Sequence, residues 1–454
     1  MRTTADVVVC GAGIGGVATA YFLSVHSGIR DVVLVDDRPP LSLTSDKSTE
    51  CYRNWWPGPG DAMVQMMNRS IDLMEAMAVE SRNRFHLNRR GYLYTTTRKE
   101  KIADLEGFAG EASALGAGEV RIHTGANQNY QPHRPEGFSE SPGGADLITD
   151  QELIQQHFPY LSSEVVGVLH VRRAGWLSAQ QYGMWMLSQA RARGAQQMVD
   201  QVVGVETRGG KVYSVQLDSG DEIRTPVFVN AAGPLLAEVA RMLGVSLPVF
   251  HELHMKASIN DSSGVVGRNA PLLIDVDPQT LHWTEDERAW LMADDESRWL
   301  LDELPSGAHV RPEGAGAAQS ILMLWDVHTD RVAPELPAPM DPFYPELAVR
   351  GLSKMLPEMA AYIRRMPQPF IDSGYYTKTE ENRPLAGPME VPGSYLIGAM
   401  SGFGIMSAAG LGELVAVQIA GKELPGYASA FDLRRYKDQE YVKMLSNWGD
   451  SWQL

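Results

Sequence analysis

Three glycines near the start of the chain are the residues whose spacing is best suited to chemistry. Gly11, Gly13 and Gly16 have the G-x-G-x-x-G spacing, and Ile14 lies within it. In this pattern the first glycine allows a tight turn, the second lets the backbone approach a pyrophosphate, and the third lets a helix pack closely on a strand. Asp36 follows at the distance where a carboxylate can accept hydrogen bonds from a ribose 2′-hydroxyl. These residues predict a dinucleotide-binding site.

The elements around these glycines have the order that such a site requires. Val7–Val9 is a β-branched run typical of a buried parallel strand. Residues 17–22 keep a helical period, and Val32–Val35 predicts the second strand, which ends at Asp36. An isolated G-x-G-x-x-G is a weak signal because glycines also occur in ordinary turns. The strand, turn, helix and strand together make it specific.

Composition narrows the class of protein. The chain has 454 residues, which favours two interleaved domains, and its 40 basic and 56 acidic residues give a net charge of −16. This balance argues against binding to nucleic acid or to an anionic membrane surface. Cys10 and Cys51 cannot form a disulfide framework, and residues 1–4 run directly into the first strand, so we expect no signal peptide and a cytoplasmic location. Leu396–Gly421 is the sole membrane-like stretch, but its glycines and serines disfavour a membrane span.

Further strands and a Gly-rich helix start occur later in the chain. Val202–Arg208 and Lys211–Leu217 read as strands, each followed by a turn, and Val227–Gly233 as a buried strand that ends in small residues. Gly402–Met406 precedes a helical pattern over Leu411–Ile419. Backbone N–H groups gather at such a helix start and stabilise negative charge.

Three motifs, in this order, resemble those of one family. Gly11–Gly16, Val229–Gly233 and Gly398–Ile405 resemble the FAD-dependent D-amino acid oxidase family, especially its sarcosine oxidase, glycine oxidase and dimethylglycine dehydrogenase branch. The resemblance runs through essentially the whole chain and is weakest in the middle. It implies FAD rather than NAD, and oxidation of a C–N bond in an amine or amino acid by hydride transfer. No second dinucleotide fingerprint is evident, which favours electrons entering from an organic substrate.

The resemblance also implies the architecture. We expect an α/β protein with a segmented Rossmann-like FAD-binding domain and an inserted α+β substrate domain built on a mostly antiparallel sheet. The FAD-binding domain would comprise residues 1–88, 147–246 and 373–424. The substrate domain would comprise residues 89–146 and 247–372, and residues 425–454 would form a C-terminal tail.

The predicted FAD contacts come from several segments. Ser45, Ser48 and Thr49 offer small donors suited to phosphate and ribityl oxygens. With the glycines, Ile14 and Asp36, the predicted FAD residues also include Val202, Ala232, Gly233, Gly402, Gly404, Ile405 and Met406.

Arg53 is the predicted substrate anchor. It falls where the sarcosine oxidase branch places an arginine for the substrate carboxylate, and its fork matches a carboxylate bidentately. A surface salt bridge is the alternative. Tyr376 stands where glycine oxidase-like enzymes place a carboxylate-binding arginine, and Met406 replaces a lysine that helps to hold the carboxylate in the sarcosine oxidase branch. These departures favour a secondary amine or a bulky, apolar substrate.

Other departures concern the flavin and oxygen. Gly374 stands where sarcosine oxidase-like enzymes carry the cysteine that bonds to the flavin, and the loop around Arg53 has no histidine, so we expect non-covalent FAD with Cys51 as the only competitor for attachment. Met323 aligns approximately with a lysine that promotes reaction with oxygen. Oxygen or a redox partner would accept the electrons.

Aromatic residues and histidines complete the candidate site. Seven aromatic residues could line a hydrophobic pocket, although many would be core residues: Tyr52, Trp55, Trp56, Trp325, Tyr375, Tyr376 and Phe403. We expect His251 and His254 to project on the same side of a strand and to serve as acid–base groups, with a structural role as the alternative. The sequence predicts no metal site and no particular oligomeric state.

Two other functions remain open on the sequence alone. One is an amine dehydrogenase that passes electrons to a protein or a quinone. The other is a non-catalytic flavoprotein assembly factor, because Tyr52, Arg53 and the central segments also resemble mitochondrial assembly-factor relatives of the family.

Overall fold

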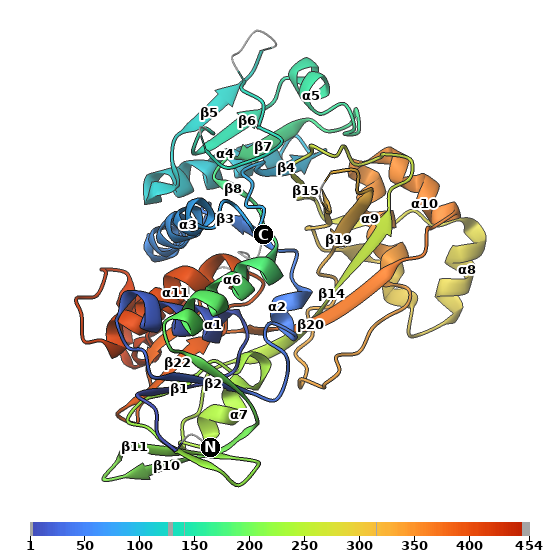
Figure 1. Cartoon of the computed structure of the whole chain (residues 1–454). Coiled ribbons are helices and arrows are strands. Elements are labelled where there is room, and N and C mark those ends of the chain that lie inside the picture. The colour runs from blue at the N-terminus through green and yellow to red at the C-terminus, as the bar shows by residue number, and fades with distance from the viewer. Residues whose placement is uncertain (1–2, 126–129, 140, 315, 447–454) are drawn as a thin grey trace.

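The computed structural model describes residues 3–125, 130–139, 141–314 and 316–446, so residues 1–2 and the end of the predicted tail at 447–454 lie outside the described part. Figure 1 shows two large sheets that the chain visits alternately, with helices packed between and around them. This is the expected α/β architecture with a second, inserted sheet.

The first sheet has six strands contributed by three separate parts of the chain. Its order is β21 (Leu385–Pro388), β22 (Ser394–Gly398), β13 (Phe228–Asn230), β1 (Val7–Cys10), β2 (Val32–Asp36) and β9 (Gln196–Val199). All neighbouring strands are parallel except the β21–β22 pair. A parallel sheet of this kind is covered on both faces, which explains the uninterrupted apolar residues of β1 and β2.

Alternate side chains of β1 enter different cores. Val7 and Val9 pack with α1 (Ile14–Tyr21) and α11 (Gly404–Ile419), whereas Val8 and Cys10 face the core under α7 (Leu236–Arg241). α6 (Ala179–Ala192) and α3 (Ala62–Glu80) pack outside α1 and α11 respectively. A three-stranded sheet lies beside α7: β10 (Val202–Arg208), β11 (Lys211–Leu217) and β12 (Glu222–Arg224).

The second sheet has nine strands and is antiparallel except at two pairings. Its order is β20 (Phe370–Lys378), β14 (Phe250–Asn260), β19 (Ser320–Leu324), β18 (His309–Pro312), β15 (Leu272–Asp275), β4 (Tyr92–Thr96), β7 (Gly167–Val171), β6 (Ala145–Ile148) and β5 (Val120–His123). The β15–β4 and β6–β5 pairs are parallel. The mostly antiparallel second sheet is therefore confirmed.

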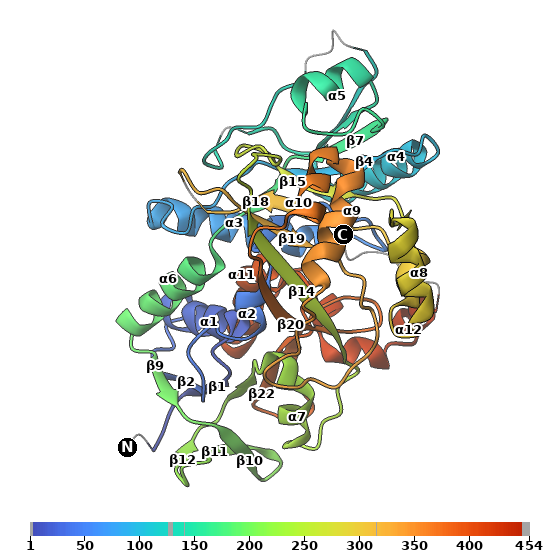
Figure 2. The same ribbon diagram turned by 90° about the vertical axis from the view of Figure 1, so that its right-hand side faces the viewer.

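Three strands of this sheet conflict with the domain boundaries predicted from the sequence. β6 spans the boundary between residues 146 and 147. β7 falls inside the segment 147–246, yet it pairs with β4 and β6 of the nine-stranded sheet. β20 extends past residue 372 and pairs with β14 along its whole length. Figure 2 shows β14 and β20 as a long ribbon that reaches from the second sheet toward the first.

The remaining elements cover the second sheet or connect the two. A short two-stranded ribbon, β3 (Cys51–Arg53) with β8 (Ala174–Trp176), lies near the junction of the two large sheets. A further pair is β16 (Gln279–Thr280) with β17 (Glu303–Leu304). The other helices are α2 (Thr44–Lys47), α4 (Lys101–Ala112), α5 (Gln151–His157), α8 (Glu285–Ala293), α9 (Tyr344–Met355), α10 (Ala360–Arg364) and α12 (Gln439–Leu445).

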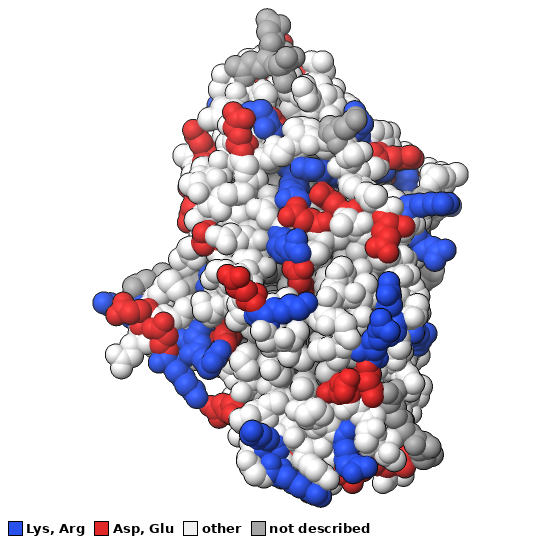
Figure 3. Space-filling view, turned by 60° about the vertical axis from the view of Figure 1, so that its left-hand side comes forward, with Lys and Arg blue, Asp and Glu red and all other residues white. Residues whose placement is uncertain are grey.

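Helix length and surface charge indicate whether a membrane or a nucleic acid could be a partner. None of the helices among the described residues combines the length and the apolar character needed to cross a bilayer. On the face shown in Figure 3, Lys and Arg side chains are interspersed with Asp and Glu. That mixture differs from the continuous basic field with which proteins hold nucleic acid.

Candidate active site

Two adjoining cavities open at the carboxyl ends of β1, β2 and β13. The first cavity has a volume of about 920 Å³ and the second about 620 Å³. The walls common to both are Gly13, Thr44, Ser45, Ala231, Gly233 and Pro234. Ligands of open parallel sheets bind at this edge, so the pair of cavities is the expected place for a dinucleotide.

The glycine loop has the geometry that the sequence pattern predicts. Gly11 has φ = +107°, and a Cβ there would lie 2.4 Å from the Ala231 carbonyl oxygen. A Cβ on Gly16 would lie 2.0 Å from the Gly11 carbonyl oxygen, so only glycine lets α1 approach β1 this closely. The Ile14 N–H at the start of α1 donates to Ser45 Oγ over 2.9 Å. The helix N-terminus thus faces the cavities with small groups around it, as a phosphate site requires.

Asp36 ends β2 and lines the first cavity. Its Oδ2 accepts the Ala12 N–H at 2.7 Å and its Oδ1 accepts the Arg38 N–H at 2.9 Å. Burial raises the pKa of Asp36, although these two backbone bonds oppose the shift. The carboxylate therefore fixes the glycine loop while facing the place where a ribose would lie. Val202, Ala232 and Gly233 line the same cavity.

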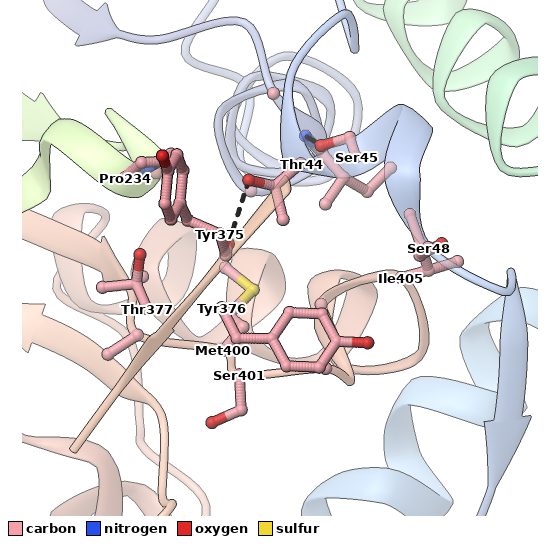
Figure 4. A pocket seen from close by; sticks show the side chains of 18 of the residues that line it. Thr44, Ser45, Ser48, Pro234, Tyr375, Tyr376, Thr377, Met400, Ser401 and Ile405 are labelled. Carbon is pink, nitrogen blue, oxygen red and sulfur yellow. Dashed lines mark hydrogen bonds between the residues drawn. The ribbon is translucent and has the colours of Figure 1, made fainter. Parts of the chain in front are cut away.

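The second cavity is formed by α2, β20 and the start of α11 (Figure 4). Tyr375 and Tyr376 leave β20 in opposite directions, and the Thr44 hydroxyl donates to the Tyr375 carbonyl at 3.2 Å. Of the residues predicted to contact FAD, this cavity is lined by Gly13, Ile14, Ser45, Ser48, Gly233, Gly402, Gly404 and Ile405. A Cβ on Gly402 would lie 2.7 Å from the Tyr376 ring, so glycine is required for this approach.

A third cavity of about 450 Å³ lies on the far side of Tyr376 and Gly402, which line both it and the second cavity. Arg53 lines it and is only 3% exposed. Its Nε donates to the Trp55 carbonyl at 3.3 Å, and its guanidinium lies 4.3 Å from the centre of the Trp56 ring. Burial among aromatic rings rejects the alternative of a surface salt bridge. Other walls of the third cavity are Thr49, Cys51, Tyr92, Leu272, Ile274, His309, Asp326, Phe403 and Met406.

Two predicted FAD residues and several aromatic residues lie elsewhere than expected. Thr49 and Met406 line the third cavity and are absent from the walls of the first two. Of the predicted aromatic lining, Tyr376 and Phe403 reach the third cavity, whereas Trp325 belongs to the separate core under α9. Met323 lies in that core as well and does not line any of the three cavities, so the approximate alignment with an oxygen-promoting lysine is not supported.

Two cations from the second sheet, one half-buried and one fully buried, hold the loop that connects the cavities. Lys256 Nζ donates to the carbonyl oxygens of Asp46 at 2.7 Å and Ser48 at 3.2 Å. Arg311, which is 1% exposed, donates from Nε to the Thr49 carbonyl at 2.8 Å. These bonds fix the position of the segment between α2 and β3. Neither cation was predicted, because a single basic residue within a strand carries no motif.

The two histidines of β14 do not share a face, contrary to the expectation. They are three residues apart, and side chains of a strand alternate, so they project to opposite sides. His251 is bonded through Nδ1 to Thr377 Oγ1 at 3.1 Å. His254 stacks on the Tyr376 ring with 3.6 Å between ring centres and does not line the third cavity.

His254 lies between two carboxylates. Its Nδ1 is 2.5 Å from Asp326 Oδ1 and its Nε2 is 3.3 Å from Glu252 Oε2. Only an imidazolium donates from both ring nitrogens. Burial opposes the charge on His254, but Asp326 and Glu252 outweigh it and raise the His254 pKa. Burial likewise opposes the charge on Asp326, whose pKa is nevertheless lowered by His254.

The sequence did not point to His309 or Asp326, which both line the third cavity. His309 begins β18, and Asp326 lies two residues after the end of β19. Neither belongs to a recognisable motif, and the two meet only because β18 and β19 pair. The described residues contain no group of three or more His, Cys, Asp or Glu arranged to hold a metal ion.

Comparison with known proteins decides the family. Residues 6–418 match the model of the family described as FAD dependent oxidoreductase. The chain belongs to this family. Dimethylglycine dehydrogenase of rat mitochondria is 23% identical over 441 residues, which cover 96% of this chain and 45% of that protein. The chain thus spans less than half the length of this curated relative.

Solved structures share the fold. L-proline dehydrogenase from P. horikoshii has a TM-score of 0.73 at 19% identity, with 96% of this chain and 99% of that one covered. Glycine oxidase from Geobacillus kaustophilus has a TM-score of 0.71 at 16% identity, with coverage of 95% and 99%. Family membership makes FAD the cofactor, and the first two cavities fit it: a glycine cradle, a helix N-terminus and a ribose-side carboxylate occur in the required order.

Proposed function

We propose that this protein oxidises a C–N bond of an amine or amino acid, with bound FAD as the hydride acceptor. The third cavity is the observation that supports this proposal. It contains a buried arginine, and it shares Tyr376 and Gly402 with the cavity assigned to FAD. A substrate held there would lie next to the cofactor.

The chain's residues have separate roles in this proposal. Arg53 binds a carboxylate of the substrate through its planar fork, and the rings of Trp56 and Tyr92 hold the guanidinium in place. Leu272, Ile274 and the other apolar walls exclude water, which favours the neutral amine that can release a hydride. FAD, when bound, supplies the two-electron acceptor.

Tyr376 and His254 position the reacting groups. Burial raises the pKa of the Tyr376 phenol well above its usual value, so the hydroxyl stays protonated and can only donate or accept a hydrogen bond. His254 acts on the site through the Tyr376 ring and through Asp326 rather than by touching substrate. With Met406 rather than a lysine in the wall, Arg53 and His309 are the nitrogen-bearing side chains of the third cavity. This composition favours a substrate with one carboxylate and an apolar body, and a secondary amine fits the same walls.

The test is reduction of the bound flavin without oxygen. Purified holoprotein is mixed anaerobically with a panel of amino acids, N-methylated amino acids and free amines, and the loss of oxidised-flavin absorbance is followed. We expect at least one class to reduce the flavin and to yield the carbonyl product of imine hydrolysis. Subsequent exposure to air separates an oxidase from a dehydrogenase that uses a protein or quinone. A flavin that no compound reduces would favour the assembly-factor alternative.

A further inference from the structure

His309 is a buried histidine of the third cavity, and the roles proposed above for Arg53, Tyr376 and His254 do not involve it. It is 5% exposed and lines this cavity together with Arg53 and Asp326. It is the first residue of β18 and pairs with Leu324 of β19. It therefore rests on the rigid central part of the nine-stranded sheet.

One hydrogen bond determines the tautomer of His309. Its Nδ1 lies 2.8 Å from the Gly307 carbonyl oxygen. A carbonyl oxygen can only accept, so Nδ1 must carry the proton. Nε2 of the neutral ring then has a lone pair, and it makes no hydrogen bond to any residue of the described part of the chain. Burial lowers the His309 pKa, which keeps the ring neutral at pH 7.

Amine oxidation needs a base in this position. An aliphatic ammonium has a pKa of about 10, as the lysine side chain does, so an amino acid enters the cavity protonated. Its nitrogen then lacks the lone pair that must form the C=N bond as the hydride leaves. A side chain of the cavity that lies within reach of the substrate nitrogen can remove this proton.

We propose that His309 Nε2 is the base that removes this proton, an inference that rests on the proposed function and deepens it. An N–H bond of the substrate ammonium breaks, its electron pair stays on nitrogen, and an Nε2–H bond forms. The positive charge passes from substrate to His309, where the Asp326 carboxylate stabilises it. His254, held between Asp326 and Glu252, keeps Asp326 ionised for this purpose.

Three other titratable groups around His309 are not suited to act as the base. Burial raises the pKa of the Cys51 thiol and of the Tyr92 and Tyr376 phenols, so none of these three is an anion near neutral pH. The positive charges of Arg53 and Arg311 lower the His309 pKa and the negative charge of Asp326 raises it. The cavity therefore combines a cation for the substrate carboxylate with a neutral base for its amino group. This arrangement selects a zwitterionic amino acid.

The decisive variant is His309→Asn. The asparagine amide can replace the Nδ1–H donor to Gly307 while it removes Nε2, so the strand start is kept. Anaerobic flavin reduction is measured from pH 6 to pH 10 in wild type, in His309→Asn and in the control His157→Asn on α5, outside the site. We expect the variant to be about 100-fold slower than wild type at pH 7, as for loss of a general base. Near pH 10 the substrate supplies its own neutral amine, and the two rates should converge.

The alternatives give distinct results. A wild type that no amine or amino acid reduces at any pH contradicts the proposed function, and this inference with it. A wild type that is reduced, but with the same pH profile as His309→Asn, overturns only the role of His309. A loss of rate in His309→Asn that is the same at every pH would also overturn the role of His309.

A measurement without substrate tests the same ring directly. In a ¹⁵N-histidine NMR spectrum of the holoprotein at pH 7, the signals that disappear in His309→Asn should be those of a neutral ring protonated at Nδ1. A ring protonated at Nε2, or at both nitrogens, would overturn the proposal.

Discussion

Asp36 joins the glycine loop to the expected ribose site through a single carboxylate. Asp36→Ala removes the acceptor of the Ala12 and Arg38 N–H groups as well as the ribose contact. We expect FAD binding to weaken by about 1–3 kcal/mol, the range for lost bonds to a charged group, while the protein stays folded. Titration of apoprotein with FAD gives the affinity, and Asp218→Ala in an exposed turn is the control. Equal affinities in wild type and Asp36→Ala would refute the ribose assignment.

Arg53 determines which substrates the third cavity accepts. Arg53→Ala should raise the concentration of carboxylated substrate needed for half-maximal flavin reduction at least tenfold, with FAD content preserved. Arg53→Lys should restore only part of the loss, because an ammonium cannot reproduce the bidentate fork. The decarboxylated analogue should be a poor substrate for the wild type. Its rate should fall little further in Arg53→Ala, because removing the arginine and removing the carboxylate delete the same interaction. Wild-type protein that accepts both compounds equally well would disprove the anchor.

At the scale of residues, the sequence identified groups that belong to motifs and missed those that do not. Gly11, Gly13, Asp36 and Arg53 line the predicted cavities because each has a fixed place in a local pattern or a family motif. His309 and Asp326 come together through strand pairing, which single-sequence reasoning does not supply. The prediction that His251 and His254 share one face of a strand was wrong for a simpler reason. Residues three apart share a face on a helix but not on a strand.

At the scale of elements, the contact between β1 and α1 is the most tightly specified packing in the cofactor region. Gly16→Ala would place a Cβ 2.0 Å from the Gly11 carbonyl oxygen, which must move α1 away from β1. We expect a loss of about 1–3 kcal/mol of stability, as for overpacking, together with loss of FAD. Gly107→Ala in α4 is the matched control, because a Cβ there meets no atom within 4 Å and the change should be neutral or stabilising. Thermal unfolding and FAD content distinguish the two, and a Gly16→Ala protein that retains both would contradict this packing.

Elements were predictable where the residue pattern is unambiguous. Val202–Arg208 and Lys211–Leu217 are strands with the predicted bounds, because β-branched residues alternate between clear turns. α8 has no such clear stop in its pattern, and it ends at Ala293 because Asp294 adopts an extended conformation. α11 begins at Gly404, seven residues before the predicted start at Leu411, because packing against α1 and α3 outweighs the low helix propensity of its glycines.

At the scale of the whole molecule, neither of the two positions considered for covalent attachment, Gly374 and Cys51, is poised to bond to the flavin. A Cβ on Gly374 would lie 3.0 Å from Lys47 Cβ, so this position is covered by α2, and Cys51 is buried with its pKa raised by that burial. We expect acid precipitation to release all FAD into the supernatant and leave a colourless pellet. Flavin that stays with the precipitated chain would contradict this expectation, and its absence in Cys51→Ser would identify the attachment residue.

The interleaving of the two sheets was predictable only through the family resemblance. Composition and length suggest two domains but not that β9, β13 and β22 return to the sheet begun by β1. The predicted domain boundaries differ from the sheet pairing at β7 and β20. These strands pair with strands far away in the sequence, and the local residue pattern does not reveal such partners.

A substrate in the third cavity should lose a hydride from the carbon next to its nitrogen. The most direct measurement is single-turnover reduction of the bound flavin by an amino acid and by its α-deuterated form, without oxygen. We expect a rate several-fold lower for the deuterated substrate and one carbonyl product for each flavin reduced. Equal rates for the two forms at every pH from 6 to 10, or flavin reduction without carbonyl product, would contradict it.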